Sequence, residues 1–300
     1  MSVVISCALV LFHPKKHRKI LKNIQELNRL LSYNFPKIDK KKKTIIRLAA
    51  LHVCFSIAYF LDYYLWVARK SLTIYKYFGF DHILRYRFII FAHYMANVVR
   101  ELNYGAKYMN KILKCANKRF GKNAAKKHNL LGIIHNDVAT ALKAHTMIAD
   151  GICCYNKIFG WTFVLMHIDS LITFLMYFQL SLKINTEQLD LIRSIFLTWM
   201  VLMMIFSVMG AISMVYNCYA TTRALKKAGT LAYSLLYTLE LKRYKEEQNL
   251  LMENLHLLIR QSTLRSPSFS AAGFFIIDYS TLFTLLNLLT SYIIVLIQFK

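Results

Sequence analysis

The sequence predicts an all-α, polytopic helical membrane protein whose helices extend far into the cytosol. Hydrophobic residues make up 56% of its 300 residues and charged residues only 18%, whereas a soluble protein carries about 25% charged residues. Only 9 Gly and 3 Pro are present, which excludes collagen-like and low-complexity chains. The apolar residues also gather in runs close to the roughly 20 residues that a helix needs to cross a bilayer.

Five of these runs are expected to span the membrane. The run at residues 195–218 contains no charge, and the run at 83–99 is the least apolar. Residues 3–12 are apolar but too short to span, so we expect the end of a helix whose beginning is absent. The expected spans are residues 45–67, 83–99, 159–182, 195–218 and 274–299.

The basic residues are segregated along the chain. There are 39 Lys and Arg against 15 Asp and Glu, a net charge of +24. Eleven of these cations lie in residues 13–43, eight in 107–127 and eight in 223–265. Because cytoplasmic loops carry the excess of Lys and Arg, the three basic segments are expected in the cytosol and Lys300 outside. A nucleic-acid-binding protein would gather its cations on one soluble surface, so no nucleic-acid partner is expected.

Two of the cytosolic segments have the spacing of amphipathic helices, with charged residues between the apolar ones. These helices either lie close to the membrane or form a cytosolic subdomain that packs subunits together. The apolar positions are Leu130, Ile134, Val138, Leu142 and Met147 in the first segment, and Leu236, Leu239, Tyr244, Leu251, Leu255 and Leu258 in the second.

The last span has one polar face. Its residues follow helical spacings of three and four, and five of the six are polar. Because polar groups in hydrocarbon are costly, this face must meet other helices or water. It is therefore either an interhelical contact or a pore wall where copies of the helix surround an axis. The six residues are Ser280, Thr284, Asn287, Ser291, Ile294 and Gln298.

Ionisable and aromatic residues inside the other spans suggest a small-molecule pocket that opens outward. The alternative is an aromatic belt at the membrane interface combined with structural hydrogen bonds. The candidate ligand-binding residues are Tyr59, Asp62, Tyr63, Trp66, His93, Asp169, Tyr177 and Trp199.

No catalytic, metal or cofactor site is expected. The six cysteines are scattered without a C-x-x-C pair, so they resemble neither a disulfide framework nor a zinc site. His145 and Asp150 match the His-x4-Asp pair of membrane acyltransferases. That pair stands in a helical cytosolic pattern without companion motifs, so we expect a packed or solvated histidine and no enzyme.

The C-terminal residues resemble a family signature. Residues 291–299 are similar to the Thr-Tyr-(five apolar)-Gln-Phe sequence that ends insect gustatory receptors, with Ser291, Tyr292, Gln298 and Phe299 at the named positions. Residues 266–275 resemble the Phe-Ser-Ala-x-Gly-Phe-Phe approach to the same helix. Ser291 replaces the usual threonine and keeps its hydroxyl.

The resemblance implies seven spans, a cytosolic N-terminus and an external C-terminus in the plasma membrane. It also implies a homo- or hetero-tetrameric cation channel that small-molecule tastants open from between the outer halves of the earlier helices. Residues 1–218 would then hold the membrane helices, 219–273 a cytosolic anchor and 274–300 the pore helix, with the family's N-terminal helix or helices missing. The expected pore-lining residues are Asn287, Ser291, Ile294, Val295 and Gln298.

Two alternative functions remain open at this point. A secondary transporter should have paired broken helices in two halves, yet Pro14, Pro36 and Pro267 all lie outside the expected spans. An odorant receptor of the same superfamily is less favoured, because the C-terminal signature is of the gustatory type.

Overall fold

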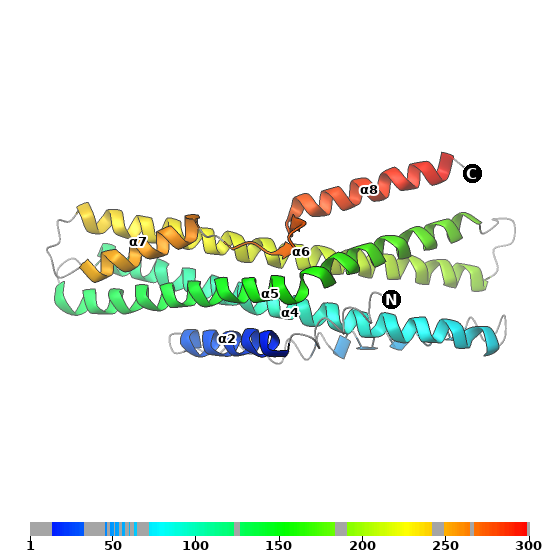
Figure 1. Ribbon diagram of the computed structural model, residues 1–300, viewed down its shortest axis with the longest axis horizontal. Coiled ribbons are helices and arrows are strands. Elements are labelled where there is room, and N and C mark those ends of the chain that lie inside the picture. Colours follow the sequence, from blue (N-terminus) through cyan, green and yellow to red (C-terminus); the bar gives the residue numbers. More distant parts are fainter. Residues whose placement is uncertain are drawn as a thin grey trace.

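The chain forms an elongated bundle of helices in a computed structural model (Figure 1). The structure describes residues 14–32, 72–122, 127–183, 191–241, 249–264 and 267–298, with a few single positions between 46 and 64. Three long helices lie side by side: α4 (Leu72–Lys122), α5 (Lys127–Lys183) and α6 (Leu191–Leu241).

Shorter elements cover the long helices. Helix α2 (Pro14–Ser32) packs on α5 and α4, and α7 (Asn249–Leu264) packs on α6 and α5 at one end of the bundle. A two-stranded antiparallel hairpin, β1 (Ser270–Ala271) and β2 (Phe275–Ile276), leads into the last helix, α8 (Tyr279–Gln298). The expectation of an essentially all-α fold is confirmed.

The long helices continue well beyond the expected spans. Helix α5 has 57 residues, which at 1.5 Å per residue is about 85 Å. Residues 107–122, part of the basic segment at 107–127, form the end of α4, so the expected long extension of a helix beyond its span is confirmed here. The physical reason is that Leu102, Met109 and Leu113 recur at helical spacing and are buried in the bundle.

The described core lies where α4, α5, α6 and α7 meet. The apolar spacing expected of the cytosolic helices is confirmed by the buried side chains of Ile134, Val138, Leu236, Leu239, Leu251, Leu255 and Leu258. Leu142 and Met147 are half-buried against this core, whereas Tyr244 and the side chain of Leu130 lie outside what the structure describes. Among the helices that the structure describes, none combines the length and the hydropathy of a membrane span. Residues 3–12 and most of the expected span at 45–67 lie outside the described part.

Three asparagines mark the contact of α4 with α6 at intervals of seven residues. The Asn103 amide donates to Asn217 Oδ1 at 3.5 Å, the Asn110 amide to the Ala224 carbonyl at 2.8 Å, and the Asn117 amide to Ser234 Oγ at 3.0 Å. The first two of these bonds are buried and the third is exposed. Polar groups at heptad spacing restrict how two helices can slide past each other. This ladder therefore specifies the register of α4 against α6.

The start of the last expected span was wrong. Residues 274–278 are not helical, because the chain forms the hairpin there and α8 begins only at Tyr279. The apolar pair Phe275–Ile276 forms strand β2 rather than the first turn of the helix. From the hairpin, α8 leads away from the bundle at an angle (Figure 1).

Candidate functional site

Residues 269–277 form the hairpin that connects α7 to α8. The chain reverses at Ala272 and Gly273, whose φ angles are +53° and +85°. Glycine adopts this left-handed region freely, whereas alanine does so at a cost of about 1–2 kcal/mol. The turn is closed by the Phe274 N–H, which donates to the Ala271 carbonyl at 3.0 Å. A strained turn of this kind persists only when its surroundings hold it in place.

The hairpin lies directly on α5 at Gly160. A β-carbon added to Gly160 would lie 2.6 Å from the backbone nitrogen of Ala272 and 3.3 Å from the Ser270 carbonyl oxygen. Side-chain carbons do not approach backbone atoms this closely, so the contact requires glycine at position 160. The missing side chain therefore determines where the hairpin docks.

The Asn156 side chain, one turn before Gly160, binds the entry to the hairpin. Its amide nitrogen donates to the Ser268 carbonyl at 2.8 Å, and its amide oxygen accepts from the Ser270 N–H at 3.0 Å. These backbone groups lie outside helices and need partners when they are taken out of water. A single side chain of α5 satisfies both.

Aromatic contacts complete the docking of the hairpin on α5. The ring of Phe269 is fully buried, whereas Phe274 lies at the surface. Edge-to-face pairs of this kind contribute about 0.5–1.5 kcal/mol beyond the area that they bury. The pairs, with centroid distances, are Phe269 with Tyr155 at 5.3 Å, Phe274 with Trp161 at 5.2 Å and Phe275 with Phe163 at 6.4 Å.

Asp278 caps the first turn of α8. Its Oδ1 accepts hydrogen bonds from the Ser280 hydroxyl at 2.6 Å, the Ser280 N–H at 3.0 Å and the Thr281 N–H at 3.3 Å. Aspartate at this position satisfies N–H groups that have no partner within the helix. The ring of Tyr279 also packs on Tyr219 of α6, with centroids 4.8 Å apart. The base of α8 is thus held by both α5 and α6.

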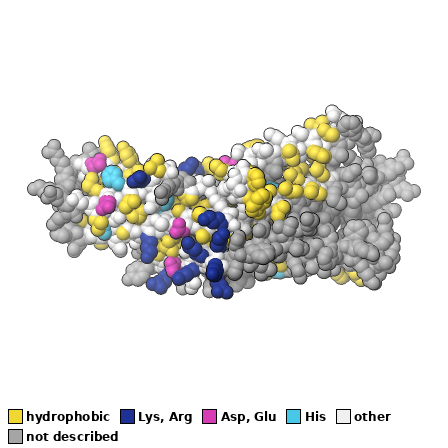
Figure 2. Space-filling view, viewed as in Figure 1, with side chains coloured by type: hydrophobic (Ala, Val, Ile, Leu, Met, Phe, Trp, Pro, Cys, Tyr) yellow, Lys and Arg dark blue, Asp and Glu magenta, His cyan; other side chains and the backbone are white. Residues whose placement is uncertain are grey.

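Beyond its base, α8 is exposed on nearly all sides. Of the expected pore-lining residues, Ile294 is 50% and Val295 45% exposed, and Asn287, Ser291 and Gln298 are also exposed. Apolar residues on other faces are equally open, as with Phe283 at 64%. Figure 2 shows hydrophobic side chains gathered over this part of the molecule. Such an apolar surface indicates contact with another helix, another subunit or lipid.

The structure leaves the expected ligand-binding set untested. Tyr63 is exposed, and His93 lies half-buried on α4. Asp169 and Tyr177 belong to α5 and Trp199 to α6, but their side chains lie outside what the structure describes. The other three members, Tyr59, Asp62 and Trp66, lie outside the described residues altogether.

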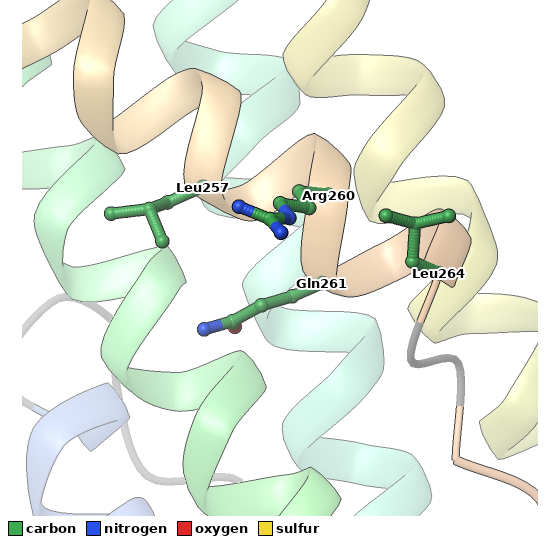
Figure 3. A pocket seen from close by; sticks show the side chains of 4 residues that line it. All are labelled: Leu257, Arg260, Gln261 and Leu264. Carbon is green, nitrogen blue, oxygen red and sulfur yellow. The ribbon is translucent and has the colours of Figure 1, made fainter.

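Two surface cavities open elsewhere on the described part. One, of about 370 Å³, is bordered by Leu257, Arg260, Gln261 and Leu264 of α7, with Gln261 extending toward α5 (Figure 3). The other, also about 370 Å³, lies between α4 and α5 and contains the ion pair of Arg119 with Asp137 at 2.9 Å. Burial raises the pKa of Asp137, and the charge of Arg119 partly opposes this rise. Neither cavity is bordered by an expected ligand-binding residue.

His145 and Asp150 do not form an acid–base pair. His145 is buried, and its Nε2 lies 3.2 Å from Ser262 Oγ of α7, whereas Asp150 is exposed. Five residues turn an α-helix by about 500°, so the two side chains point roughly 140° apart. Burial lowers the pKa of His145, and a hydrogen bond with Gln261 partly opposes that. No cluster of metal-binding side chains occurs among the described residues.

Sequence reasoning missed the residues that hold the hairpin. The Ala272-Gly273 turn and the Asp278-x-Ser280 cap are local signals that could have marked the end of a strand pair and the start of a helix. Asn156 and Gly160 carry no such signal, because their partners lie more than 100 residues away along the chain.

Two comparisons relate the whole chain to known proteins. The sequence model of the family described as 7tm Chemosensory receptor matches residues 1–300. The chain is also similar to a protein named Putative gustatory receptor 28b from Drosophila melanogaster, with 28% identity over 169 residues. That alignment covers 54% of this chain and 34% of the relative, so the chain matches about a third of that protein's length.

Proposed function

This chain belongs to the 7tm chemosensory receptor family, and on that premise we propose that it is a subunit of a gustatory receptor. The receptor would be a ligand-gated, non-selective cation channel of the plasma membrane that small-molecule tastants open. The observation that carries the proposal is α8, which beyond its base combines a stripe of polar residues with an apolar surface that nothing in the described chain covers.

The polar stripe of α8 favours a pore over a simple packing surface. Asn287, Ser291 and Gln298 are all exposed and share one face of the helix. A single helix cannot enclose a water path, so copies from several subunits must surround a common axis. The apolar faces would then contact lipid and neighbouring helices. A homo- or hetero-tetramer with related subunits meets both requirements.

Charge supports the orientation of the chain in the bilayer. The basic segment of α4 lies in the half of the bundle that contains α7, whereas α8 extends toward the opposite end (Figure 1). The excess of Lys and Arg assigns the α7 half to the cytosol. The C-terminus then lies outside the cell.

The contact between the hairpin and α5 would couple ligand binding to the opening of the pore. Helix α5 carries two members of the proposed outward-facing ligand set, Asp169 and Tyr177, and also the docking position Gly160. A ligand that favours one position of α5 would thereby shift the base of α8 and favour one state of the pore. No new contact between the ligand and α8 is needed.

Current recordings from full-length subunits, expressed alone and with related subunits, test the proposal. Ile294 interrupts the polar stripe and forms a constriction that closes by dewetting, so Ile294→Ser should raise the resting current. Gln298→Glu should increase the permeability to divalent cations. Leu289→Ile, on a different face, is the control and should leave selectivity unchanged. If the first two variants reach the surface and conduct like the parent, α8 does not line the pore.

A further inference from the structure

The basic face of α2 is the charged surface that the channel proposal leaves unused. On one side of this helix, Ile20, Leu27 and Leu31 are buried against the bundle. On the other side, the exposed residues include Lys15, Arg18, Lys19 and Lys22. Figure 2 shows Lys and Arg side chains gathered in this region of the molecule. Helix α2 is thus fixed by its apolar side and presents its cations outward.

Three contacts place α2 along α4. The Tyr94 hydroxyl lies 2.6 Å from His17 Nε2, and the two rings are stacked with centroids 5.5 Å apart. Further along, the Asn28 amide donates to the Glu101 carboxylate at 3.3 Å. Gly105 leaves room for Leu27, since a β-carbon there would lie 2.5 Å from a Leu27 methyl carbon. Helix α2 therefore runs parallel to α4.

The position of Tyr94 locates the basic end of α2. Tyr94 belongs to the expected span at residues 83–99, whereas Gly105 lies beyond it on the cytosolic side. The cytosolic end of that span, at Val99, is therefore level with the middle of α2, near Lys22, and the last turns of α2 lie deeper in the cytosol. Lys15, Arg18 and Lys19 lie up to about 10 Å on the membrane side of this level, from which their long side chains can reach the headgroups.

Helix α5 adds a fifth cation at the same level. Lys157 is exposed and lies two residues before the expected span at 159–182. Burial raises the pKa of the Cys154 thiol; the charges of Lys19 and Lys157 oppose that rise, and those of Cys153 and Asp150 add to it. Because both cations act on one thiol, they share a neighbourhood. The nearby exposed acids lie toward the cytosol: Glu26 is one turn beyond Lys22 on α2, and Asp150 is seven residues from Lys157, or about 10 Å along α5.

The five cations are not neutralised within the described chain. None of Lys15, Arg18, Lys19, Lys22 and Lys157 forms an ion pair among the residues that the structure describes. Exposed cations just inside a membrane attract anionic headgroups, and clusters of four to eight are typical of such sites. Lysine and arginine also match the charge of a phosphate group.

We propose that Lys15, Arg18, Lys19, Lys22 and Lys157 form a binding site for the phosphate-bearing headgroups of anionic lipids in the inner leaflet. The site rests on the membrane orientation proposed above. It differs from the rest of the basic surface because it combines two helices at the level of the bilayer surface. Bound lipid would hold α2 beside the part of α5 that receives the hairpin.

A direct binding measurement tests this site. The purified full chain in neutral detergent would be titrated into a fluorescent short-chain phosphatidylinositol bisphosphate, with short-chain phosphatidylcholine as the neutral comparison. Each cation near an anionic lipid surface strengthens binding about fivefold. The triple variant Lys19→Gln, Lys22→Gln, Lys157→Gln should therefore weaken binding by at least about tenfold, given incomplete additivity. Replacing the same three lysines with arginine should preserve binding.

A second triple variant controls for net charge. Lys107→Gln, Lys114→Gln, Lys118→Gln removes three exposed cations of α4 that lie farther from the proposed bilayer surface. It should change the affinity less than about threefold, because charges beyond one Debye length are screened. Both glutamine variants should melt within about 2 °C of the parent, as expected for exposed substitutions.

Three outcomes would overturn the lipid site. Equal weakening by the two glutamine triples would mean that net charge alone binds the lipid. No binding by the parent chain would mean that there is no site. Equally tight binding of free inositol trisphosphate or of an acidic peptide would mean that the ligand is not a membrane lipid. The assay requires no current, so a failed channel proposal leaves its result standing and a failed lipid site leaves the channel proposal standing.

Discussion

Replacing Gly160 with alanine should destabilise the protein, although the same change at Gly132 of the same helix should stabilise it. In a helix interior alanine is favoured over glycine by about 1 kcal/mol. At Gly160 the new methyl group would lie 2.6 Å from the Ala272 nitrogen and 3.0 Å from its Cα. Those are backbone atoms of a turn with two positive φ angles, so they cannot move aside without disturbing the hairpin.

The magnitude follows from the difference between these two effects. Forcing an extra carbon into a close-packed contact costs about 1–3 kcal/mol, and the upper value applies because the neighbour is backbone. The net effect of Gly160→Ala is then a loss of about 2 kcal/mol. Gly132, also inside α5, has no atom within 4 Å of its β-carbon position. Gly132→Ala should therefore gain about 1 kcal/mol, which leaves a gap of about 3 kcal/mol between the variants.

Thermal unfolding of the detergent-solubilised chain at one scan rate measures this gap. An unfolding entropy of about 2.1 cal/mol/K per residue gives about 1.6 °C in Tm per kcal/mol for a chain of 300 residues, so the variants should differ by roughly 5 °C. Trp161, which packs on Phe274 at 5.2 Å, provides a fluorescence signal close to the hairpin. Equal increases in Tm for the two variants would show that the hairpin does not dock at Gly160.

Three further predictions concern pH, the polar ladder and topology. Burial lowers the pKa of His145 in the folded chain, so the unfolded chain binds a proton that the folded chain does not. The contribution of this histidine to stability should be complete above about pH 6.5 and be lost as the pH falls through the lowered pKa. In a series of melting curves at different pH, His145→Gln should flatten this loss. Asn110→Ala should lower the free energy of unfolding by about 1–3 kcal/mol, because the Asn110 amide is buried and donates a hydrogen bond to the Ala224 carbonyl. Asn110→Asp should lower the Tm further. Asn117→Ala should cost less than Asn110→Ala, because the hydrogen bond of Asn117 is exposed. A tag after Lys300 should bind antibody on intact cells, whereas a tag after Lys122 should require permeabilisation; the reverse pattern would refute the orientation.

The parts of the fold that depend on local periodicity could be predicted from the sequence. Buried positions such as Val138 and Leu255 were identified because an apolar residue every three to four positions marks the inner face of a helix. The start of α8 was misplaced because hydropathy does not separate the apolar strand Phe275–Ile276 from the apolar helix that follows. The Asp278 cap contained the missing information.

The candidate site was harder to predict because its contacts are distant in sequence. The resemblance drew attention to residues 266–275, but spacing alone does not indicate that their partners are Asn156 and Gly160. An asparagine and a glycine inside a helix are individually unremarkable, and their importance follows only from the contact that the hairpin makes with them in the folded chain. The same reason keeps the ligand-binding set a prediction, since it requires the relative placement of four expected spans.

Helix α5 is the element through which the proposed functions would interact. It runs without interruption from Lys127 to Lys183, and Gly160 lies nine residues, or about 14 Å, from the proposed ligand residue Asp169. A continuous helix moves nearly as a rigid rod, so a shift at Asp169 would reach the hairpin little diminished. On the cytosolic side of Gly160, Lys157 belongs to the proposed lipid site and His145 contacts α7. A ligand, a lipid and the packing of α7 would therefore all bias the position of one helix, and through the hairpin the state of α8, without direct contact among themselves.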